Sequence, residues 1–407
     1  MRRPASYVVI LFSLLFAPAA YANSLMAVGA AEDGPKSLDP LVTMAKMDLA
    51  RRAGFDALRL TVPWNRGQHG PSSEVLTQLQ NAAGAAELNG IRLFLNVYPT
   101  GSRQTPLTNR QRKDFADFTA AIARANPTIT DFIIGNEPNL NRFWMPQFTR
   151  SGGDAAAPMY VTLLAVVYDA LKEVSPEINV IGGAVSPRGS DNPRSIRQTH
   201  SPTRFIPNMG RAYRRMRRGK PIMDAFAYHP YTRRSRISPT VRHPEPWSKT
   251  IGLADYDRLV GALGVAFDGT AQRGSALPIV YDEFGVQTQI PASKRRLYVN
   301  QLAPSGRDAV REAVQARYYR EALKLAYCQP TVAAFLIFHI SDERDLDRWQ
   351  SGIFYADDTP KTSFGPVRNS VAAARAGHLT LCKSVLHPAP PFSLRPHGAA
   401  RVPGRRH

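Results

Sequence analysis

Cysteine is scarce in this chain of 407 residues, which contains only Cys328 and Cys382. Two thiols cannot form a zinc site on their own, so the sequence predicts no metal centre. In an exported protein two cysteines commonly pair, whereas in a reducing compartment they remain free thiols. We expect a Cys328–Cys382 disulfide that ties the end of a late helix to the C-terminal segment.

Long apolar runs are absent after the N-terminus. The single run, residues 7–16, follows Arg2 and Arg3 and precedes the triplet Ala-Tyr-Ala that ends at Ala22. A basic start, a short apolar stretch and an A-x-A triplet are typical of a secretory signal, which predicts a signal peptide over residues 1–22. A membrane anchor is the alternative, but the run is short for a bilayer span. We therefore predict a secreted, extracytoplasmic protein without a stable membrane span after cleavage.

Acidic residues are also few. The chain has 32 Asp and Glu against 52 Lys and Arg, a formal charge of +20. Such a charge indicates either attraction to an anionic partner, such as an acidic glycan or a cell wall, or an arginine-rich solvated surface. No nucleic-acid-binding motif accompanies it, so we expect no nucleic-acid partner. The Pro- and Arg-rich tail, residues 385–407, is predicted to be disordered.

Short apolar runs and helical patterns alternate through the rest of the chain. Eight strand-like runs are expected at residues 24–31, 55–64, 91–98, 131–137, 179–185, 224–231, 277–284 and 332–340. A helical pattern follows each of them, at residues 40–53, 73–89, 109–125, 157–174, 202–217, 254–267, 307–327 and 364–376. Eight such units predict a single-domain α/β fold over residues 23–384, a (β/α)8 TIM barrel with long βα loops. No Gly-rich phosphate loop follows the first strand, which argues against a doubly wound sheet.

Two of the runs end in a glutamate. Glu137 lies in IIGNEPNL after the fourth run, beside Asn136, and Glu283 lies in IVYDEFG at the end of the seventh. In a parallel barrel the carboxyl ends of the strands carry the active site. Two facing carboxylates are the minimum needed to cleave a glycosidic bond. The alternative is that both glutamates form ordinary ion pairs.

These segments resemble those of clan A glycoside hydrolases, which place an Asn-Glu pair after strand four and a second Glu at the end of strand seven. The segment NEPNLNRFW is similar to the family 39 branch of β-xylosidases and α-iduronidase. The resemblance implies that Glu137 is the acid/base and Glu283 the nucleophile, and that Asn136 binds the sugar 2-hydroxyl. It also implies that Arg59 sits beside the nucleophile.

The motif YHPY supplies two further candidates, His229 and Tyr231, which match the clan's His-x-Tyr pattern on strand six. His229 is read equally well as a core histidine. By strand alternation Asp282 is expected to point away from the barrel axis, because its neighbour Glu283 points to the mouth.

All four tryptophans, Trp64, Trp144, Trp247 and Trp349, follow strand-like runs. Their faces could stack on sugars, so we take Trp64, Trp144 and Trp349 as substrate-binding candidates; loop packing is the alternative. The eighth run, FLIFHISDE, lacks the tryptophan that clan members often carry there, and Trp349 is the candidate to replace it.

These residues predict a retaining glycosidase that hydrolyses O-glycosidic bonds of a poly- or oligosaccharide through two glutamates, without a cofactor. A carbohydrate-binding or cell-surface protein with weak or no hydrolysis is one alternative. A transglycosylase using the same residues is another.

Overall fold

The strands of this protein close into a barrel. A computed structural model describes residues 26–300, 308–379 and 382. The strands are β1 (Ala27–Ala31), β2 (Ala57–Trp64), β3 (Arg92–Pro99), β4 (Asp131–Ile134), β5 (Asn179–Val185), β6 (Ala225–Tyr228), β7 (Ile279–Phe284) and β8 (Val332–Phe338). They pair in chain order, each parallel to its neighbours, and β8 pairs with β1. The predicted (β/α)8 fold is confirmed.

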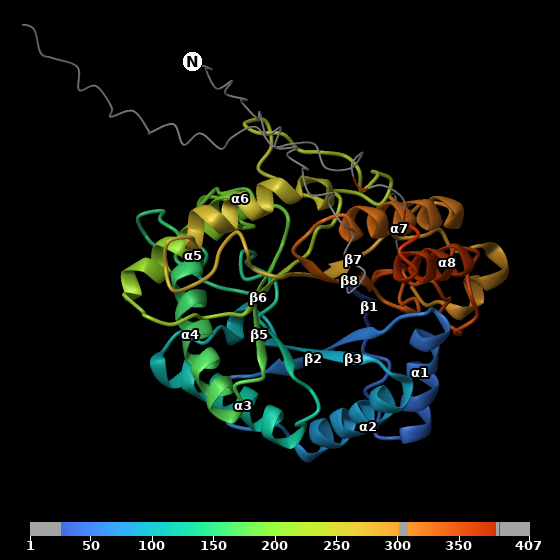
Figure 1. Ribbon diagram of the computed structural model, residues 1–407, viewed down its shortest axis with the longest axis horizontal. Helices are drawn as coiled ribbons and strands as arrows, with labels where there is room; N and C mark the ends of the chain where they lie inside the picture. Colours follow the sequence, from blue (N-terminus) through green and yellow to red (C-terminus); the bar gives the residue numbers. More distant parts are fainter. Residues whose placement is uncertain (1–25, 301–307, 380–381, 383–407) are drawn as a thin grey trace, which may run out of the picture.

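A ring of helices surrounds the barrel (Figure 1). They are α1 (Pro40–Arg52), α2 (Ser73–Asn89), α3 (Asn109–Ala125), α4 (Ala156–Val174), α5 (Pro202–Met216), α6 (Tyr256–Phe267), α7 (Glu312–Tyr327) and α8 (Phe364–Arg375). Short 3-10 turns occur at η1 (Ser102–Gln104), η2 (Leu253–Asp255) and η3 (Ala292–Leu297). Local signals set several helix starts; at α3, Thr108 and Gln111 form a capping box that pairs two otherwise free N–H groups.

Strand alternation sorts the apolar side chains into two layers. Small and aliphatic residues such as Ala57, Ile133, Ala227 and Leu336 fill the barrel interior. A larger set, including Leu58 and Leu60, faces outward and packs between sheet and helices. The interior is therefore a packed core, and polar chemistry is confined to the barrel's mouth.

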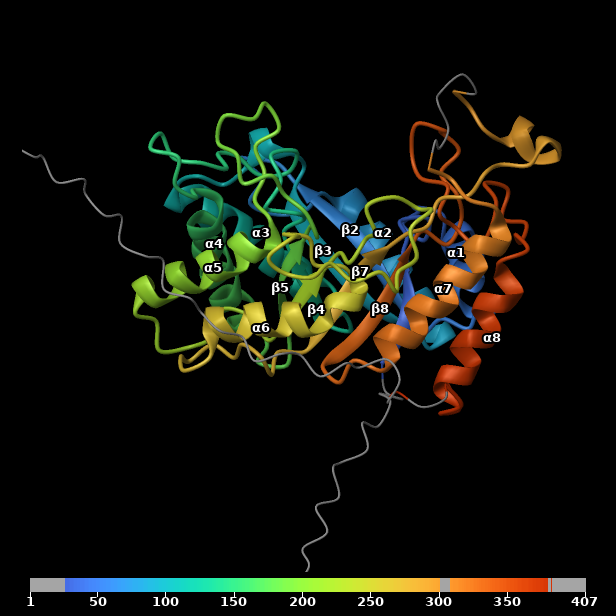
Figure 2. The same ribbon diagram turned by 90° about the horizontal axis from the view of Figure 1, so that it is seen from above.

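Long connections follow the later strands and gather on one side of the barrel, at the top of Figure 2. They follow β4, β5, β6, β7 and β8, at residues 135–155, 186–201, 229–252, 285–311 and 339–363, with residues 301–307 outside the described part. Because they leave the carboxyl ends of parallel strands, they surround the face on which barrel enzymes carry their active sites.

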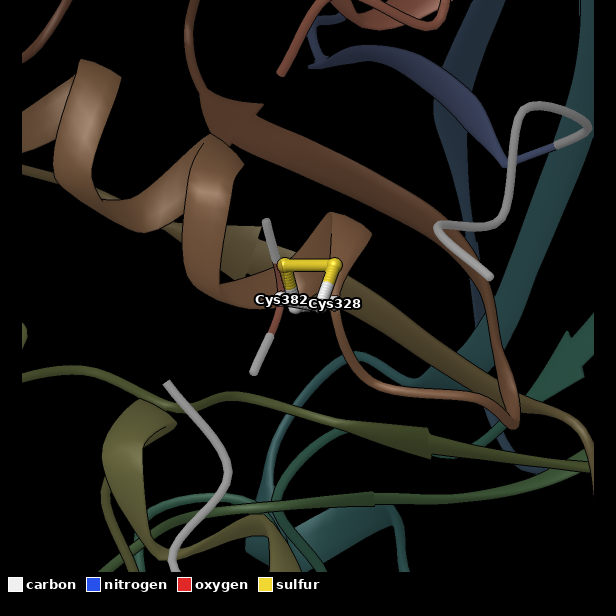
Figure 3. Close-up of a disulfide and its surroundings, with 2 residues drawn as sticks. All are labelled: Cys328 and Cys382. Carbon is white, nitrogen blue, oxygen red and sulfur yellow. A yellow bond between two sulfur atoms is a disulfide. The ribbon is translucent and has the colours of Figure 1, made fainter. Parts of the chain in front are cut away.

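Cys328 and Cys382 form the predicted disulfide (Figure 3). Cys328 follows α7 and precedes β8, so the bond lies at the amino ends of the strands, opposite the long loops. The predicted signal peptide at residues 1–22 and tail at 385–407 lie outside the described residues. Within the described residues, no helix combines the length and apolar character that a membrane span requires.

Candidate active site

Glu137 lies three residues beyond β4 on an unusual backbone. The strand ends at Ile134, Gly135 turns the chain at φ 88°, and Glu137 itself has φ 39°. Positive φ is uncommon outside glycine and is found preferentially at functional sites. The Glu137 N–H donates to the Ala184 carbonyl at 2.8 Å, which fixes the turn against the end of β5. The carboxyl is thus held at the mouth of the barrel.

Glu283 lies within β7 and is held by two donors. Arg59 of β2 donates from Nη1 to Glu283 Oε1 at 2.6 Å, and the Tyr231 hydroxyl donates to Oε2 at 3.0 Å. Arg59 is only 2% exposed. Burial lowers the pKa of Arg59, but the negative charges of Glu283 and Asp282 raise it above its ordinary value. The guanidinium therefore remains charged beside Glu283.

Arg59 also links Glu283 to the other strands. Its Nη2 donates to Asn96 Oδ1 at 2.5 Å and to Asn136 Oδ1 at 3.2 Å. Asn96 in turn donates to the Gly135 carbonyl at 2.7 Å. One buried cation thus connects β2, β3, the turn after β4 and β7, and it brings the predicted Arg59, Asn136 and Glu283 together.

His229 stands between the two glutamates. Its Nδ1 lies 3.2 Å from Glu137 Oε1 and 3.5 Å from Glu283 Oε2, and its Nε2 lies 3.3 Å from Asp282 Oδ2. Burial alone lowers the pKa of His229, but Glu283 and Asp282 raise it well above its ordinary value. His229 is fully buried, as expected of a core histidine, and it also contacts both glutamates, as expected of a site residue.

The structure corrects the expectation for Asp282. Its side chain points into the barrel, where it contacts His229 and lies 3.5 Å from Arg59 Nε. Asp282 has the same parity as Val280, which faces the barrel interior, so alternation along β7 already turns it inward. Glu283 is the residue that departs from alternation, because the register of β7 against β8 is irregular between Tyr281 and Phe284. Burial raises the pKa of Asp282, but His229 and Arg59 lower it below its ordinary value.

Comparison with solved structures gives many with the same fold. A family 39 glycoside hydrolase from the gut symbiont Bacteroides cellulosilyticus WH2 matches with a TM-score of 0.60 at 18% identity, covering 86% of this chain and 64% of that one. The GH39 enzyme from Xanthomonas axonopodis pv. citri matches with a TM-score of 0.53 at 14% identity, covering 86% and 66%. A GH39 β-xylosidase from Caulobacter crescentus gives 0.52 at 17% identity, covering 86% and 72%.

The chain has the fold of the clan A glycoside hydrolases. The resemblance to family 39 noted in the sequence is supported at the level of the fold. The chain spans just under two thirds of the length of the first two of these relatives. No family model matches the sequence, and no curated protein matches it significantly.

In this barrel the glutamates line a cavity of about 740 Å³. Besides Glu137 and Glu283, its wall includes Asn136, Arg59, Tyr231 and Trp349. Trp349 packs against Tyr231 with ring centroids 5.3 Å apart. The aromatic surface therefore enters from the loop after β8, as the sequence suggested for this residue.

The other tryptophans lie outside the cavity wall. Trp64 is buried between sheet and helices, where its ring meets Phe115 edge-on at 5.2 Å. Trp144 is buried against Tyr160. Trp247 is 86% exposed. The structure thus corrects the substrate-binding prediction for Trp64 and Trp144, which are packing residues.

Several cavity residues were not singled out by sequence reasoning. Glu32, directly after β1, and the pair His339 and Glu343, after β8, also line the wall. His339 belongs to the cavity wall, whereas Asp342, three residues on, is buried and pairs with Lys361 at 2.7 Å. An acid directly after a strand-like run was the available signal for Glu32, much like the acid that ends the run at Glu137.

The described residues contain no group of three or more His, Cys, Asp or Glu side chains arranged to hold a metal ion. The contacts between Glu137, Glu283, His229 and Arg59 bring two carboxylates, one buried imidazole and one buried guanidinium together at the barrel mouth.

Proposed function

We propose that this protein is an exported retaining glycosidase in which Glu137 is the general acid/base and Glu283 the nucleophile. The observation that carries the proposal is the convergence of both carboxylates on His229 Nδ1, at 3.2 and 3.5 Å. The two contacting oxygens can be no further apart than these distances together. That limit favours the carboxyl separation of retaining enzymes, about 5 to 5.5 Å, over that of inverting enzymes, about 6.5 to 9.5 Å.

In the first step Glu283 attacks the anomeric carbon while Glu137 gives its proton to the departing oxygen. The glycosidic bond breaks, and a covalent glycosyl-enzyme forms on Glu283. Glu137, now ionised, takes a proton from water, and the water oxygen displaces Glu283 from the anomeric carbon. The Arg59 guanidinium and the Tyr231 hydroxyl stabilise the carboxylate of Glu283 before attack and again as it leaves.

Export is part of the proposal. It rests on the basic start, short apolar run and Ala-Tyr-Ala triplet of residues 1–22. The Cys328–Cys382 disulfide is in keeping with an oxidising compartment. Mass measurement of the mature N-terminus after secretion by a bacterial host tests it, with cleavage after Ala22 as the expected result.

The catalytic assignment is tested with Glu283→Ala and Glu137→Ala on a panel of aryl glycosides and polysaccharides. We expect Glu283→Ala to lose activity and azide to restore turnover, giving a glycosyl azide of inverted configuration. For Glu137→Ala, azide attacks the glycosyl-enzyme and gives a product of retained configuration.

Glu87→Ala serves as the matched control, because Glu87 is exposed on α2 and makes no contact with the cavity. Full activity of Glu283→Ala on the substrate identified would contradict the proposal.

A further inference from the structure

The charges around the cavity are segregated. Acidic wall residues gather on the loops after β1 and β8, which are adjacent strands, and comprise Glu32, Asp33, Glu343 and Asp347. Arginines gather on the loops after β4, β5 and β6, which lie across the barrel, and comprise Arg142, Arg188, Arg233 and Arg234. There is one exception on each side: Arg348 lies on the acidic side, and Asp308, after β7, lies beside Arg234. The cavity therefore has an acidic wall and a basic wall, with the glutamate pair between them.

Two residues of the acidic wall, Glu32 and Asp33, already have partners within the protein. Glu32 accepts from the backbone N–H groups of Gly34 and Ile340, at 2.8 and 3.0 Å. Asp33 accepts from the Thr61 N–H at 2.8 Å and lies 3.1 Å from Lys36. These carboxylates have fixed partners, so they do not call for a cationic ligand.

The basic wall is not satisfied in the same way. Arg234 has Asp308 at 3.8 Å. In the part of the chain that the structure describes, Arg142, Arg188 and Arg233 have no carboxylate within 4.0 Å, and Nη1 of Arg188 is buried without a hydrogen-bond partner. A buried, unpaired guanidinium N–H is costly, and a ligand anion is the group that would satisfy it.

Arg188 also has a defined place relative to the chemistry. Burial lowers the pKa of Arg188; the charge of Glu137 raises it, and the charge of Arg233 lowers it further. The guanidinium therefore lies within electrostatic range of both residues. Since Glu137 protonates the departing oxygen in the proposed function, Arg188 lies on the side of the cavity that receives the leaving group.

We propose that the leaving-group part of the substrate carries a uronic-acid carboxylate, which Arg188 binds with Arg233 beside it. This inference rests on the proposed function, because Glu137 defines the leaving-group side. A planar guanidinium pairs with a carboxylate through two parallel hydrogen bonds, which a neutral sugar cannot offer. The arginine excess of the chain thereby has a specific use at the basic wall of the cavity.

The test compares each acidic glycan with its own carboxyl-reduced form, which differs only at the charged group. Oligosaccharides of polygalacturonate, alginate and hyaluronan serve as probes. On the substrate that is cleaved, we expect kcat/KM for the acidic form to exceed that for the reduced form by about ten-fold or more. Arg188→Met should bring this ratio close to one, mainly through KM, and Arg188→Lys should restore part of it.

Arg320→Met is the matched control, because Arg320 is exposed on α7 and outside the cavity wall, and it should keep the native ratio. Equal kcat/KM for the acidic and reduced forms, or an unchanged ratio in Arg188→Met, would overturn the inference while leaving the glycosidase intact.

Binding separates this inference from the proposed function. Calorimetry with Glu283→Gln measures affinity for the same pairs without turnover. If no glycan is hydrolysed, the proposed function fails, yet preference of Glu283→Gln for the acidic form, lost in Glu283→Gln/Arg188→Met, still supports the uronate site. Equal affinity for both forms, or no measurable binding of either, overturns it.

Discussion

At the scale of single residues, the Tyr231 hydroxyl is a hydrogen-bond donor to the proposed nucleophile, Glu283. A single substitution removes this donor without removing the ring. Burial raises the pKa of Tyr231 well above its ordinary value, and the charges of Glu283 and Glu137 raise it further. The hydroxyl therefore keeps its proton at any working pH and remains a donor to Glu283.

Tyr231→Phe removes this donor and leaves the ring against Trp349. A hydrogen bond to a charged group contributes about 1.5 to 3 kcal/mol, so we expect kcat to fall by about ten- to a hundred-fold with little change in KM. Steady-state kinetics on the identified substrate check this. Tyr213→Phe, whose hydroxyl bonds only backbone carbonyls after α5, should leave kcat unchanged. An undiminished kcat in Tyr231→Phe would mean that this hydroxyl does not support the nucleophile.

His229 predicts a pH dependence of stability. Its pKa in the folded state is well above the ordinary value of about 6.5. A raised folded pKa gives stability that is complete below the unfolded pKa and is lost as pH rises through the folded pKa. The stabilising contribution of the imidazolium is therefore full below about pH 6.5 and declines above it.

His229→Asn removes the titration, so the difference in melting temperature between wild type and variant should shrink as pH rises above about 6.5. Melting curves from pH 5 to 9 measure it, and the slope matters more than the offset, because lost packing shifts all points alike. A difference that stays constant or widens with rising pH would show that His229 is neutral in the folded protein.

At the scale of elements, one hydroxyl joins the ends of β4 and β5. Tyr160 of α4 donates to the Ile134 carbonyl at 2.6 Å and accepts from the Gly183 N–H at 2.7 Å. Gly183 has φ 100°, and a Cβ there would lie 2.5 Å from the Ala227 carbonyl oxygen, so only glycine fits at this position. These two hydrogen bonds of the Tyr160 hydroxyl hold the strand ends next to the turn that carries Glu137.

Tyr160→Phe should therefore destabilise the protein by about 1 to 3 kcal/mol, because it leaves two buried backbone groups unpaired without opening a cavity. The same variant should lower kcat, since Tyr160 holds the end of β4, and Glu137 lies three residues beyond that end. Chemical denaturation and kinetics measure the two effects. Unchanged stability would show that another group takes over both bonds.

The order of elements could be predicted from the sequence, down to the bounds of α2, α3 and β5. Apolar periodicity and capping residues act locally, and a local signal is visible in a single sequence. The strand after which Glu137 lies is shorter than expected, ending at Ile134, because Gly135 turns the chain. A glycine in a run signals such a turn but does not specify its direction.

Side-chain direction was less predictable than the elements. On β2, Arg59 faces the barrel interior and Trp64 lies five positions further along. Residues an odd number of positions apart face opposite sides of a strand, so alternation places Trp64 in the outer layer, where it is found. On β7, alternation counted from Glu283 gave the wrong direction for Asp282, because the register irregularity brings Glu283 to the same side as Asp282. Asn96 was detectable as the lone polar residue in LFLNVY, whereas the position of Arg188 in the cavity wall depends on loop packing, which one sequence does not reveal.

At the scale of the whole molecule, the disulfide links the residue after α7 to the segment that follows α8. Cys328 and Cys382 are 54 residues apart, and the segment between them contains β8 and α8. β8 closes the barrel against β1. The bond therefore restrains, in the unfolded chain, the unit that completes the barrel, and it does so at the face opposite the cavity.

Replacing both cysteines, Cys328→Ala with Cys382→Ala, should lower the free energy of unfolding by about 2 to 4 kcal/mol. Without the bond, the unfolded chain gains conformational entropy over the loop between the two residues. The kcat should not change at temperatures where the protein is folded, since the bond touches no residue of the cavity wall. Chemical denaturation of the double variant, beside wild type with and without reductant, measures the loss. Reduced wild type should match the double variant. A loss of stability in the double variant but not in reduced wild type would point to packing of the sulfur atoms. A fall in kcat at temperatures below the melting transition would mean that closure of the barrel at β8 is coupled to the geometry of the glutamate pair.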